Sequence, residues 1–247
     1  MLTEERYTQI LRILQEKRAV TVTELTACLH TSESTIRRDL NALHEQGKLN
    51  KVHGGATLLT NSFTIQEEDV RTKARLHIKE KERIARYAAS VVNDCDFVYI
   101  DAGTTTEKVI DHLQDTRATF VTNGVAHAKK LIQKGFKAYI IGGQLKLSTE
   151  AVVGAEAVLN LKKFNFTKAF LGANGISDDH GVTTPDVEEG LIKTEAVNRS
   201  YVAYVLADSS KFGKISSVTF ADLSQVCIVT DSVPDTKYHD KAVIKEV

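Results

Sequence analysis

The sequence predicts a mixed α/β protein with a small helical N-terminal domain and a larger C-terminal domain built on a parallel sheet. Up to about residue 59, apolar residues recur at helical spacing and are followed by a short basic segment with two glycines. From residue 77 onward, short apolar runs alternate with helical patterns, as in strands joined by helices in a parallel sheet. We therefore expect domains at residues 1–59 and 77–247, joined by a linker at 60–76.

Composition and charge fit a folded protein of the cytoplasm. The 247 residues are 42% hydrophobic and 26% charged, and no apolar run is long enough to span a bilayer. The first residues lack the basic start and apolar stretch of a signal peptide. Cys28, Cys95 and Cys227 are odd in number and widely separated, which argues against a disulfide framework and against a metal site.

Three helices and a hairpin are expected in the N-terminal domain. Thr3, Thr23 and Ser32 each precede apolar residues at helical spacing, so each is expected to cap a helix. Gly47 ends the third helix. Residues 48–59 then suit a two-stranded hairpin that turns at its pair of glycines. Helix, glycine stop and basic hairpin in this order describe a winged helix-turn-helix, which binds DNA.

The third helix is the element expected to read the DNA sequence. Ile36, Leu40 and Leu43 form its buried face, so Arg37 and Arg38 lie on sides open to a partner. One arginine is expected to read a base, where a bidentate contact to guanine gives about 1–3 kcal/mol of discrimination, and the other to hold a phosphate. Alternatively, Arg37 pairs with a nearby carboxylate on a solvated helix. The expected DNA contacts are Ser34, Thr35, Arg37 and Arg38 on the helix and Lys48, Lys51 and His53 on the wing.

A strongly basic segment begins at the end of the expected linker. Residues 71–86 contain seven lysine or arginine residues and two glutamates. Such a helix can contact phosphate groups, and it is equally compatible with a solvated helix between the domains. The net charge of the whole chain is zero, but the placement of the basic groups decides whether nucleic acid binds.

The C-terminal domain is expected to contain a largely parallel sheet. Helices fill most of the gaps between its strands, and glycines or polar residues cluster just after the strand ends. Ligands of such sheets bind at the carboxyl ends of the strands, so a pocket is expected there. The expected strands are residues 97–102, 118–122, 138–141, 168–173, 203–207 and 226–230.

The segment after the first of these strands has the residues of an anion site. Gly103 allows close approach of the backbone, and the hydroxyl groups of Thr104 and Thr105 donate hydrogen bonds. A helix follows at once, and its N-terminus favours negative charge. A phosphate group fits this site, although the same residues also suit a simple capped turn between strand and helix.

Two motifs of the N-terminal domain are long enough to be specific. TIRRDL occupies residues 35–40, Gly47 lies seven residues further on, and VHGGA occupies residues 52–56. This pattern is similar to the signature of DeoR-type bacterial regulators. The family usually has an arginine before Val-His-Gly-Gly, where this chain has Lys51. Lysine keeps the charge but not the bidentate geometry, so Lys51 is expected to contact phosphate.

The strand ends of the C-terminal domain resemble the DeoR-type effector domain, which is related in fold to ribose-5-phosphate isomerase. The stretches at residues 81–90 and 97–110 are most similar to fructose-operon repressors. The resemblance implies a repressor that binds operator DNA as a dimer or tetramer and leaves it on binding a sugar phosphate, fructose 1-phosphate. Activation in place of repression depends on where the operator lies. The implied effector contacts are Asp101, Gly103, Thr104, Thr105, Asn123, Gly142, Gly143, Glu150, Asn174, Gly175, Glu189, Lys193, Asp208 and Lys211.

An enzyme that isomerises or hydrolyses a sugar phosphate is the competing hypothesis. Asp101, Glu189 or Lys193 would then act as acid and base. Glu189 and Lys193 lie four residues apart on one helix, so they either pair with each other or face the pocket. The DNA-binding domain argues against catalysis, and the sequence contains no P-loop, nucleophilic triad or metal cluster. We therefore expect no catalytic residue, no metal and no cofactor.

Overall fold

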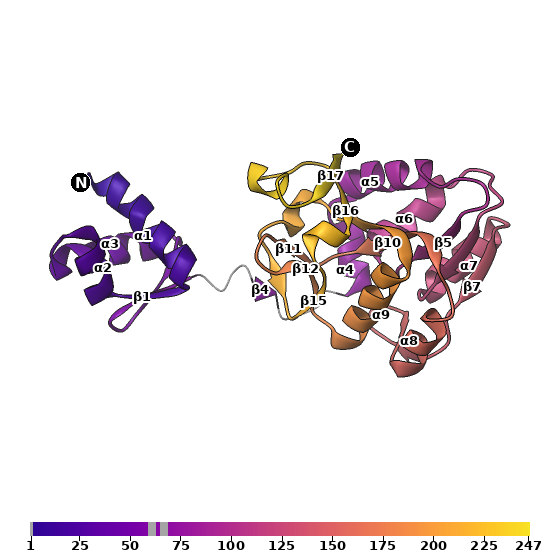
Figure 1. Cartoon of the computed structure of the whole chain (residues 1–247), viewed down its shortest axis with the longest axis horizontal. Helices are drawn as coiled ribbons and strands as arrows, with labels where there is room; N and C mark the ends of the chain where they lie inside the picture. The colour runs from indigo at the N-terminus through magenta and orange to yellow at the C-terminus, as the bar shows by residue number, and fades with distance from the viewer. Residues whose placement is uncertain (1, 59–62, 65–68) are drawn as a thin grey trace. The chain divides into compact units, whose positions relative to one another are not determined.

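The computed structural model describes residues 2–58, 63–64 and 69–247, and the chain divides into two compact units, Met1–Ser62 and Phe63–Val247 (Figure 1). The expected linker, residues 60–76, lies partly outside the described residues. Its described part forms strand β4 (Phe63–Thr64) and helix α4 (Val70–Arg75), which belong to unit 2. Unit 2 thus begins earlier in the chain than the boundary at residue 77 that the sequence predicts.

Unit 1 has the winged helix-turn-helix architecture. Strands β2 and β3 form the wing, which turns at His53 and Gly54, one residue earlier than the sequence predicts. Gly54 has φ +81°, a backbone conformation that favours glycine. The helices are α1 (Thr3–Lys17), α2 (Val22–Leu29) and α3 (Glu33–Glu45), and the strands are β1 (Ala19–Thr21), β2 (Asn50–Val52) and β3 (Gly55–Thr57), in the order β1-β3-β2.

The helix starts agree only in part with the predicted caps. Ser32 caps α3, because its hydroxyl oxygen accepts a hydrogen bond from the amide three residues on at 3.2 Å. The cap of α2 is Thr21 and not Thr23. Thr21 Oγ1 accepts from the Glu24 amide at 3.1 Å, and the Glu24 carboxylate accepts from the Thr21 amide at 2.9 Å. This reciprocal pair satisfies two amides at once, so it prevails over a single threonine cap. Thr3 is already the first residue of α1.

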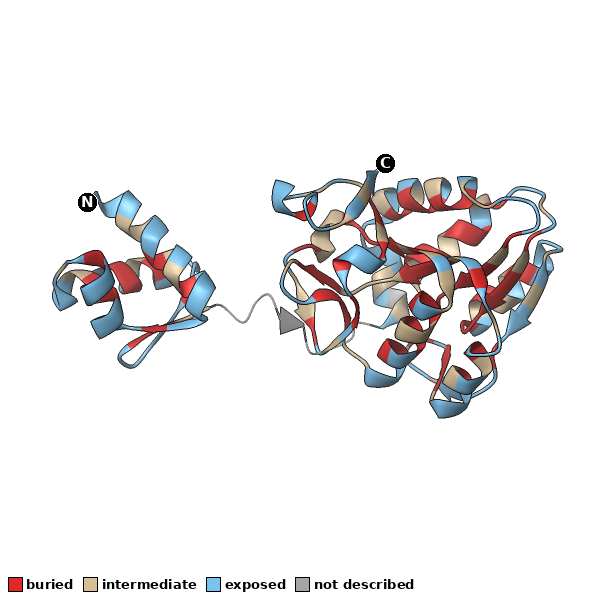
Figure 2. Ribbon diagram, in the orientation of Figure 1, coloured by how far each residue is buried: buried red, intermediate tan, exposed pale blue. Residues whose placement is uncertain are grey.

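The core of unit 1 follows the predicted helical spacing. Ile36, Leu40 and Leu43 of α3 are fully buried and belong to one cluster with Ile10 and Leu14 of α1. Figure 2 shows the buried residues on the inner sides of the helices and exposed residues on the outer sides. The opposite side of α3 is therefore free for a partner.

Unit 2 is built on a seven-stranded parallel sheet, as far as its residues are described. All six apolar runs that the sequence predicts as strands are present, and a further edge strand, β17, follows them. The order is β17-β16-β13-β10-β5-β6-β7. These strands are β5 (Phe97–Ile100), β6 (Thr119–Thr122), β7 (Lys137–Ile140), β10 (Phe166–Gly172), β13 (Ser200–Leu206), β16 (Cys227–Thr230) and β17 (Val243–Glu246).

Helices cover both faces of this sheet (Figure 1). Val98 and Ile100 of β5 point to the cluster that contains α5, α6 and α7, whereas Tyr99 points to the cluster that contains α8 and α9. The alternation of side chains along a strand thus builds two cores, one on each face. The helices are α5 (Ile78–Ser90), α6 (Thr104–His112), α7 (Val125–Gln133), α8 (Ala155–Leu161) and α9 (Val187–Asn198).

Smaller strands and short 3-10 helices lie beside the main sheet. An antiparallel sheet contains β11 (Gly175–Ser177), β12 (Gly181–Thr184) and β15 (Val218–Ala221). Strands β8 (Gln144–Lys146) and β9 (Ala151–Val153) form a hairpin, and β14 (Ile215–Ser216) pairs with β4. The 3-10 helices are η2 (Ser209–Lys211), η3 (Leu223–Gln225) and η4 (Thr236–Tyr238). Among the described residues, no helix is long and apolar enough to cross a membrane.

Candidate functional site

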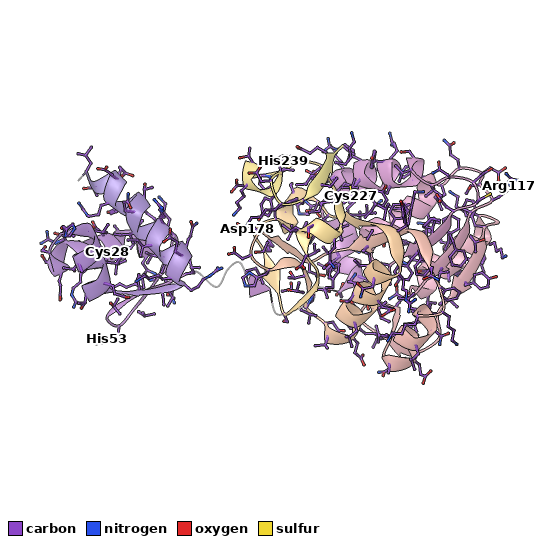
Figure 3. The ribbon with its side chains drawn as sticks, in the orientation of Figure 1. Cys28, His53, Arg117, Asp178, Cys227 and His239 are labelled. Carbon is purple, nitrogen blue, oxygen red and sulfur yellow. The ribbon has the colours of Figure 1, made fainter. Side chains whose placement is uncertain are left out.

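The outer side of α3 and the wing present the predicted DNA contacts together. A hollow in the surface of unit 1 is lined by Arg37 of α3 and by Lys51 and His53 of the wing. His53 stands at the turn of the wing (Figure 3). Of the predicted contacts, Thr35 is half-buried, and the exposed residues are Ser34, Arg37, Arg38, Lys48, Lys51 and His53. A major groove admits one helix, so this surface can offer groups from two elements to one duplex.

A buried ion pair removes the acidic residue of the RRD run from this surface. Asp39 is 3% exposed and accepts hydrogen bonds from Arg6 Nε at 2.5 Å and Arg6 Nη2 at 3.0 Å. The pair joins α1 to α3 and occupies both oxygens of the carboxylate. Asp39 therefore does not neutralise the two arginines that precede it.

Arg37 forms the carboxylate pair that the sequence allowed as an alternative. Its Nη2 lies 3.2 Å from Glu33 Oε2, and both side chains are more than half exposed. Exposed pairs of this kind contribute about 0–1 kcal/mol, so a phosphate or a base can replace Glu33 at little cost. Arg38 has no ion-pair partner among the residues that the structure describes.

In unit 2, hydrogen bonds from the end of β6 and from α7 hold the loop between β5 and α6 in place. Asn123, at the end of β6, accepts hydrogen bonds on Oδ1 from the Ala102 amide and from the Tyr99 hydroxyl, each at 2.9 Å. His127 of α7 is buried, and its Nε2 lies 3.0 Å from the Gly103 carbonyl oxygen. Burial lowers the pKa of His127. Asn123, a predicted effector contact, and His127 thus shape the loop.

Two predicted residues of α9, Glu189 and Lys193, face the inside of unit 2 and do not pair with each other. Lys193 Nζ donates to Asp101 Oδ2 and, at 3.1 Å, to the Gly172 carbonyl oxygen. Glu189 Oε1 accepts from Thr149 Oγ1 at 2.7 Å. Since both side chains are buried, the surface ion pair that the sequence also allows is absent, and α9 is tied to the ends of β5 and β10.

Two lysines of this region, Lys73 of α4 and Lys81 of α5, are not among the predicted effector contacts. Lys81 is 4% exposed, and its Nζ donates to the Lys73 carbonyl oxygen and, at 3.1 Å, to Thr104 Oγ1. Burial lowers the pKa of Lys81 to about 8; Asp208 opposes this shift, and the ammonium groups of Lys211 and Lys73 add to it. A signal existed, because Lys81 lies one helical turn before Ile84 on the apolar side of its helix.

The loop between β5 and α6, the buried side chains of α9 and Lys81 surround one pocket at the carboxyl ends of the strands. The predicted residues that line it are Asp101, Gly103, Thr104, Thr105, Asn174, Glu189, Lys193, Asp208 and Lys211. Further lining residues are Val70, Lys73, Lys81, Ala102, Thr149, Gly172, Ala173, Leu206 and Ala207. The described residues contain no group of three or more side chains that could hold a metal ion.

The other predicted effector contacts lie outside the lining of this pocket. Gly142 and Gly143 are exposed between β7 and β8. Glu150 is exposed with φ +52°, and its carbonyl oxygen accepts from an amide of α7 at 3.1 Å. Gly175 is buried at the start of β11, where an added Cβ would lie 2.4 Å from the Lys214 carbonyl oxygen. Asn123 is also absent from the lining, but it bonds to the Ala102 amide of the loop that lines the pocket.

Asp208 provides an acceptor that no described residue uses. Its Oδ1 accepts hydrogen bonds from the amide and the hydroxyl group of Ser210, at 3.1 and 2.5 Å. Its Oδ2 is buried without a hydrogen-bond partner among the described residues. A buried carboxylate oxygen without a donor is destabilising by about 1–3 kcal/mol or more, so a hydroxyl group of a ligand would be favourable there.

Each of the two units matches a domain of a known protein family. Residues 6–62 match the DeoR-like helix-turn-helix domain, and residues 76–232 match the DeoR C terminal sensor domain. The chain belongs to the DeoR family. A DeoR-family protein with a helix-turn-helix domain and a sensor domain is a DNA-binding transcriptional regulator.

Several DeoR-type relatives match along the whole chain. The regulator FruR of Bacillus subtilis, described as uncharacterised, is 40% identical over 251 residues, covering 100% of this chain and 99% of the relative. The lactose phosphotransferase system repressor of Streptococcus mutans is 32% identical with the same coverage. Among solved structures, ribose 5-phosphate isomerase from Plasmodium falciparum aligns with 53% of this chain and 52% of its own, at 13% identity and TM-score 0.39.

Proposed function

We propose that this regulator represses a sugar-utilisation operon and leaves its operator when a sugar phosphate binds the pocket of unit 2. Fructose 1-phosphate is the candidate effector, because residues 81–90 and 97–110 resemble fructose-operon repressors. A lactose phosphotransferase system repressor among the relatives also favours a sugar operon.

The proposal rests on one observation. The same pocket contains a cationic region that can bind a phosphate group and an unused hydrogen-bond acceptor that can bind a hydroxyl group. Lys81 and Thr104 lie beside the N-terminus of α6, where partial positive charge favours a phosphate. Asp208 Oδ2 supplies an acceptor for a sugar hydroxyl group. A small polyol with one phosphate group supplies both an anion for the cationic region and a hydroxyl group for Asp208, whereas a free sugar lacks the anion.

The same pocket favours binding over catalysis. The groups that an isomerase would use as acid and base are engaged in fixed pairs, Lys193 with Asp101 and Glu189 with Thr149. Such pairs rigidify a site, and a general base needs an accessible lone pair directed at the substrate. We therefore propose a sensor without catalytic activity and without a cofactor.

DNA binding is proposed to involve two copies of the chain. A single winged helix reads one half-site, and a dimer or tetramer with two-fold symmetry reads two half-sites in a palindromic operator. In each copy the proposed contacts are those on α3 and the wing. Arg37 and Arg38 would divide base reading and phosphate binding between them.

Fluorescence anisotropy of operator DNA tests the proposal directly. Labelled DNA from upstream of the operon that contains the gene is titrated with the protein, and the complex is then titrated with fructose 1-phosphate, other sugar phosphates, fructose and inorganic phosphate. Release by one sugar phosphate, and not by fructose, is the expected result. A complex that no sugar phosphate dissociates would refute the proposed effector class, and conversion of a sugar phosphate in the same samples would favour the enzyme.

A further inference from the structure

Helix α4 lies against the pocket of unit 2 and follows the segment that connects the two units in the chain. Asp69 caps this helix by accepting a hydrogen bond from the Thr72 amide at 2.7 Å. Val70 and Lys73 line the pocket. None of the described side chains of α4 belongs to the buried apolar clusters of unit 2. The attachment of α4 therefore depends on polar contacts more than on apolar packing.

Lys81 makes the contact that joins α4 to the proposed phosphate subsite. Its ammonium group donates to the carbonyl oxygen of Lys73 in α4 and to Thr104 Oγ1 in the first turn of α6. A second contact holds the start of α4, where the Val70 amide lies 3.5 Å from the Ser148 carbonyl oxygen. The buried ammonium group of Lys81 thus connects α4 with α6 within the pocket lining.

We propose that Lys81 couples the effector to α4, so that the phosphate group of a bound sugar phosphate fixes this helix against the sensor domain. This inference rests on the proposed function of the pocket. An ammonium group has three N–H donors. Two of them are used by Lys73 and Thr104, which leaves the third for a phosphate oxygen at the N-terminus of α6.

The charge of the ligand explains why binding would tighten this contact. Burial and the neighbouring ammonium groups lower the pKa of Lys81 to about 8, although Asp208 opposes this shift. A phosphate group in the pocket favours the charged form, and a charged donor makes a stronger hydrogen bond to the Lys73 carbonyl oxygen. The effector would thereby stabilise the docked position of α4.

A second attachment of the connecting segment lies next to another pocket residue. Strand β4 pairs in parallel with β14, where Phe63 is opposite Ile215 and Thr64 is opposite Ser216. Strand β14 follows η2, which carries Lys211 in the pocket lining. The chain that leads into unit 2 is thus attached at two places, and each of them adjoins a cationic residue of the pocket.

Hydrogen exchange of the full-length protein tests the coupling. Backbone amides of residues 69–76 are measured by mass spectrometry without ligand, with fructose 1-phosphate and with inorganic phosphate. Coupling between two sites is typically 5–150-fold, so exchange in α4 is expected to slow by about tenfold with fructose 1-phosphate. Lys81→Met should remove this slowing and the release of operator by the effector.

Lys79→Met is the matched control, because Lys79 lies on the same helix and is exposed. It should behave like the wild type in exchange and in operator release. Wild-type protein that is released from operator without any change of exchange in α4 would overturn the coupling and leave the proposed function standing. A wild-type complex that no sugar phosphate releases would overturn the proposed function, and the coupling with it.

Discussion

Replacement of Asp39 with alanine is expected to destabilise the DNA-binding unit by about 2–3 kcal/mol. Asp39 is 3% exposed and accepts two hydrogen bonds from Arg6. Alanine would leave the guanidinium group of Arg6, whose side chain is 12% exposed, without its carboxylate. Removal of one partner of a fully buried pair costs about 3–5 kcal/mol, and the remaining contact of Arg6 with water lowers this cost.

Calorimetry of the full-length protein measures the effect on the unfolding transition of unit 1. For a domain of this size, each kcal/mol lowers Tm by about 4–8 °C, so a decrease of about 8–24 °C is expected. Glu16→Ala is the matched control, because it removes a carboxylate from a pair with Arg12 in which both side chains are more than 60% exposed. The control should lose at most about 1 kcal/mol. Equal shifts for the two variants would refute the role of Asp39 as a buried link between α1 and α3.

Four further predictions concern operator binding, effector binding and pH. Arg37→Ala and Arg38→Ala are expected to weaken operator binding, by about 1–3 kcal/mol for the arginine that reads a base, without changing effector affinity in titration calorimetry. Lys48→Ala should weaken binding to all DNA sequences alike and lower the slope of log affinity against log salt by about 1. Thr104→Ala is expected to lower effector affinity and to leave operator affinity unchanged; normal release of operator by the effector would place the phosphate elsewhere. The pKa of Lys81 is about 8 in the folded protein and 10.5 for an unperturbed lysine side chain, so the unfolded chain binds this proton more tightly. The contribution of Lys81 to folding stability therefore rises with pH across this interval, whereas effector affinity should fall as the ammonium group is lost. A pH profile of effector affinity that is identical in Lys81→Met would contradict this account.

The central strands of the sheet are predictable because they are buried on both faces. Phe97–Ile100 and Cys227–Thr230 are continuous apolar runs, as strands covered by helices on both sides must be. Strand β17 is not a continuous apolar run and is therefore not predicted. Val243–Glu246 lies at the edge of the sheet and contains Lys245 and Glu246. The antiparallel sheet of β11, β12 and β15 is missed for a related reason, because its strands are three or four residues long and contain threonine and serine.

The position of the pocket is also predictable, but the role of each residue in it is not. Ligands of parallel sheets bind at the carboxyl ends of the strands, and this rule correctly brings Asp101, Asn174 and Asp208 to one edge of the sheet. The rule does not distinguish a side chain that faces the pocket from one that turns to the backbone, as Asn123 does. That distinction depends on which carbonyl and amide groups of the loop lack partners, and only the folded loop determines them.

The sign of the charge that the pocket accepts depends on pairing, which a sequence does not specify. Asp101 and Glu189 make the strand ends look acidic, yet Lys193 neutralises the first and Lys146, 3.0 Å away, neutralises the second. At Lys81, by contrast, burial and the ammonium groups of Lys211, Lys73 and Lys108 disfavour its positive charge, and Asp208 opposes them. The end of the pocket beside α6 is therefore the end that gains most from an anion. For this reason fructose should bind far more weakly than fructose 1-phosphate, and equal affinities in titration calorimetry would show that the acidic groups, and not Lys81, determine recognition.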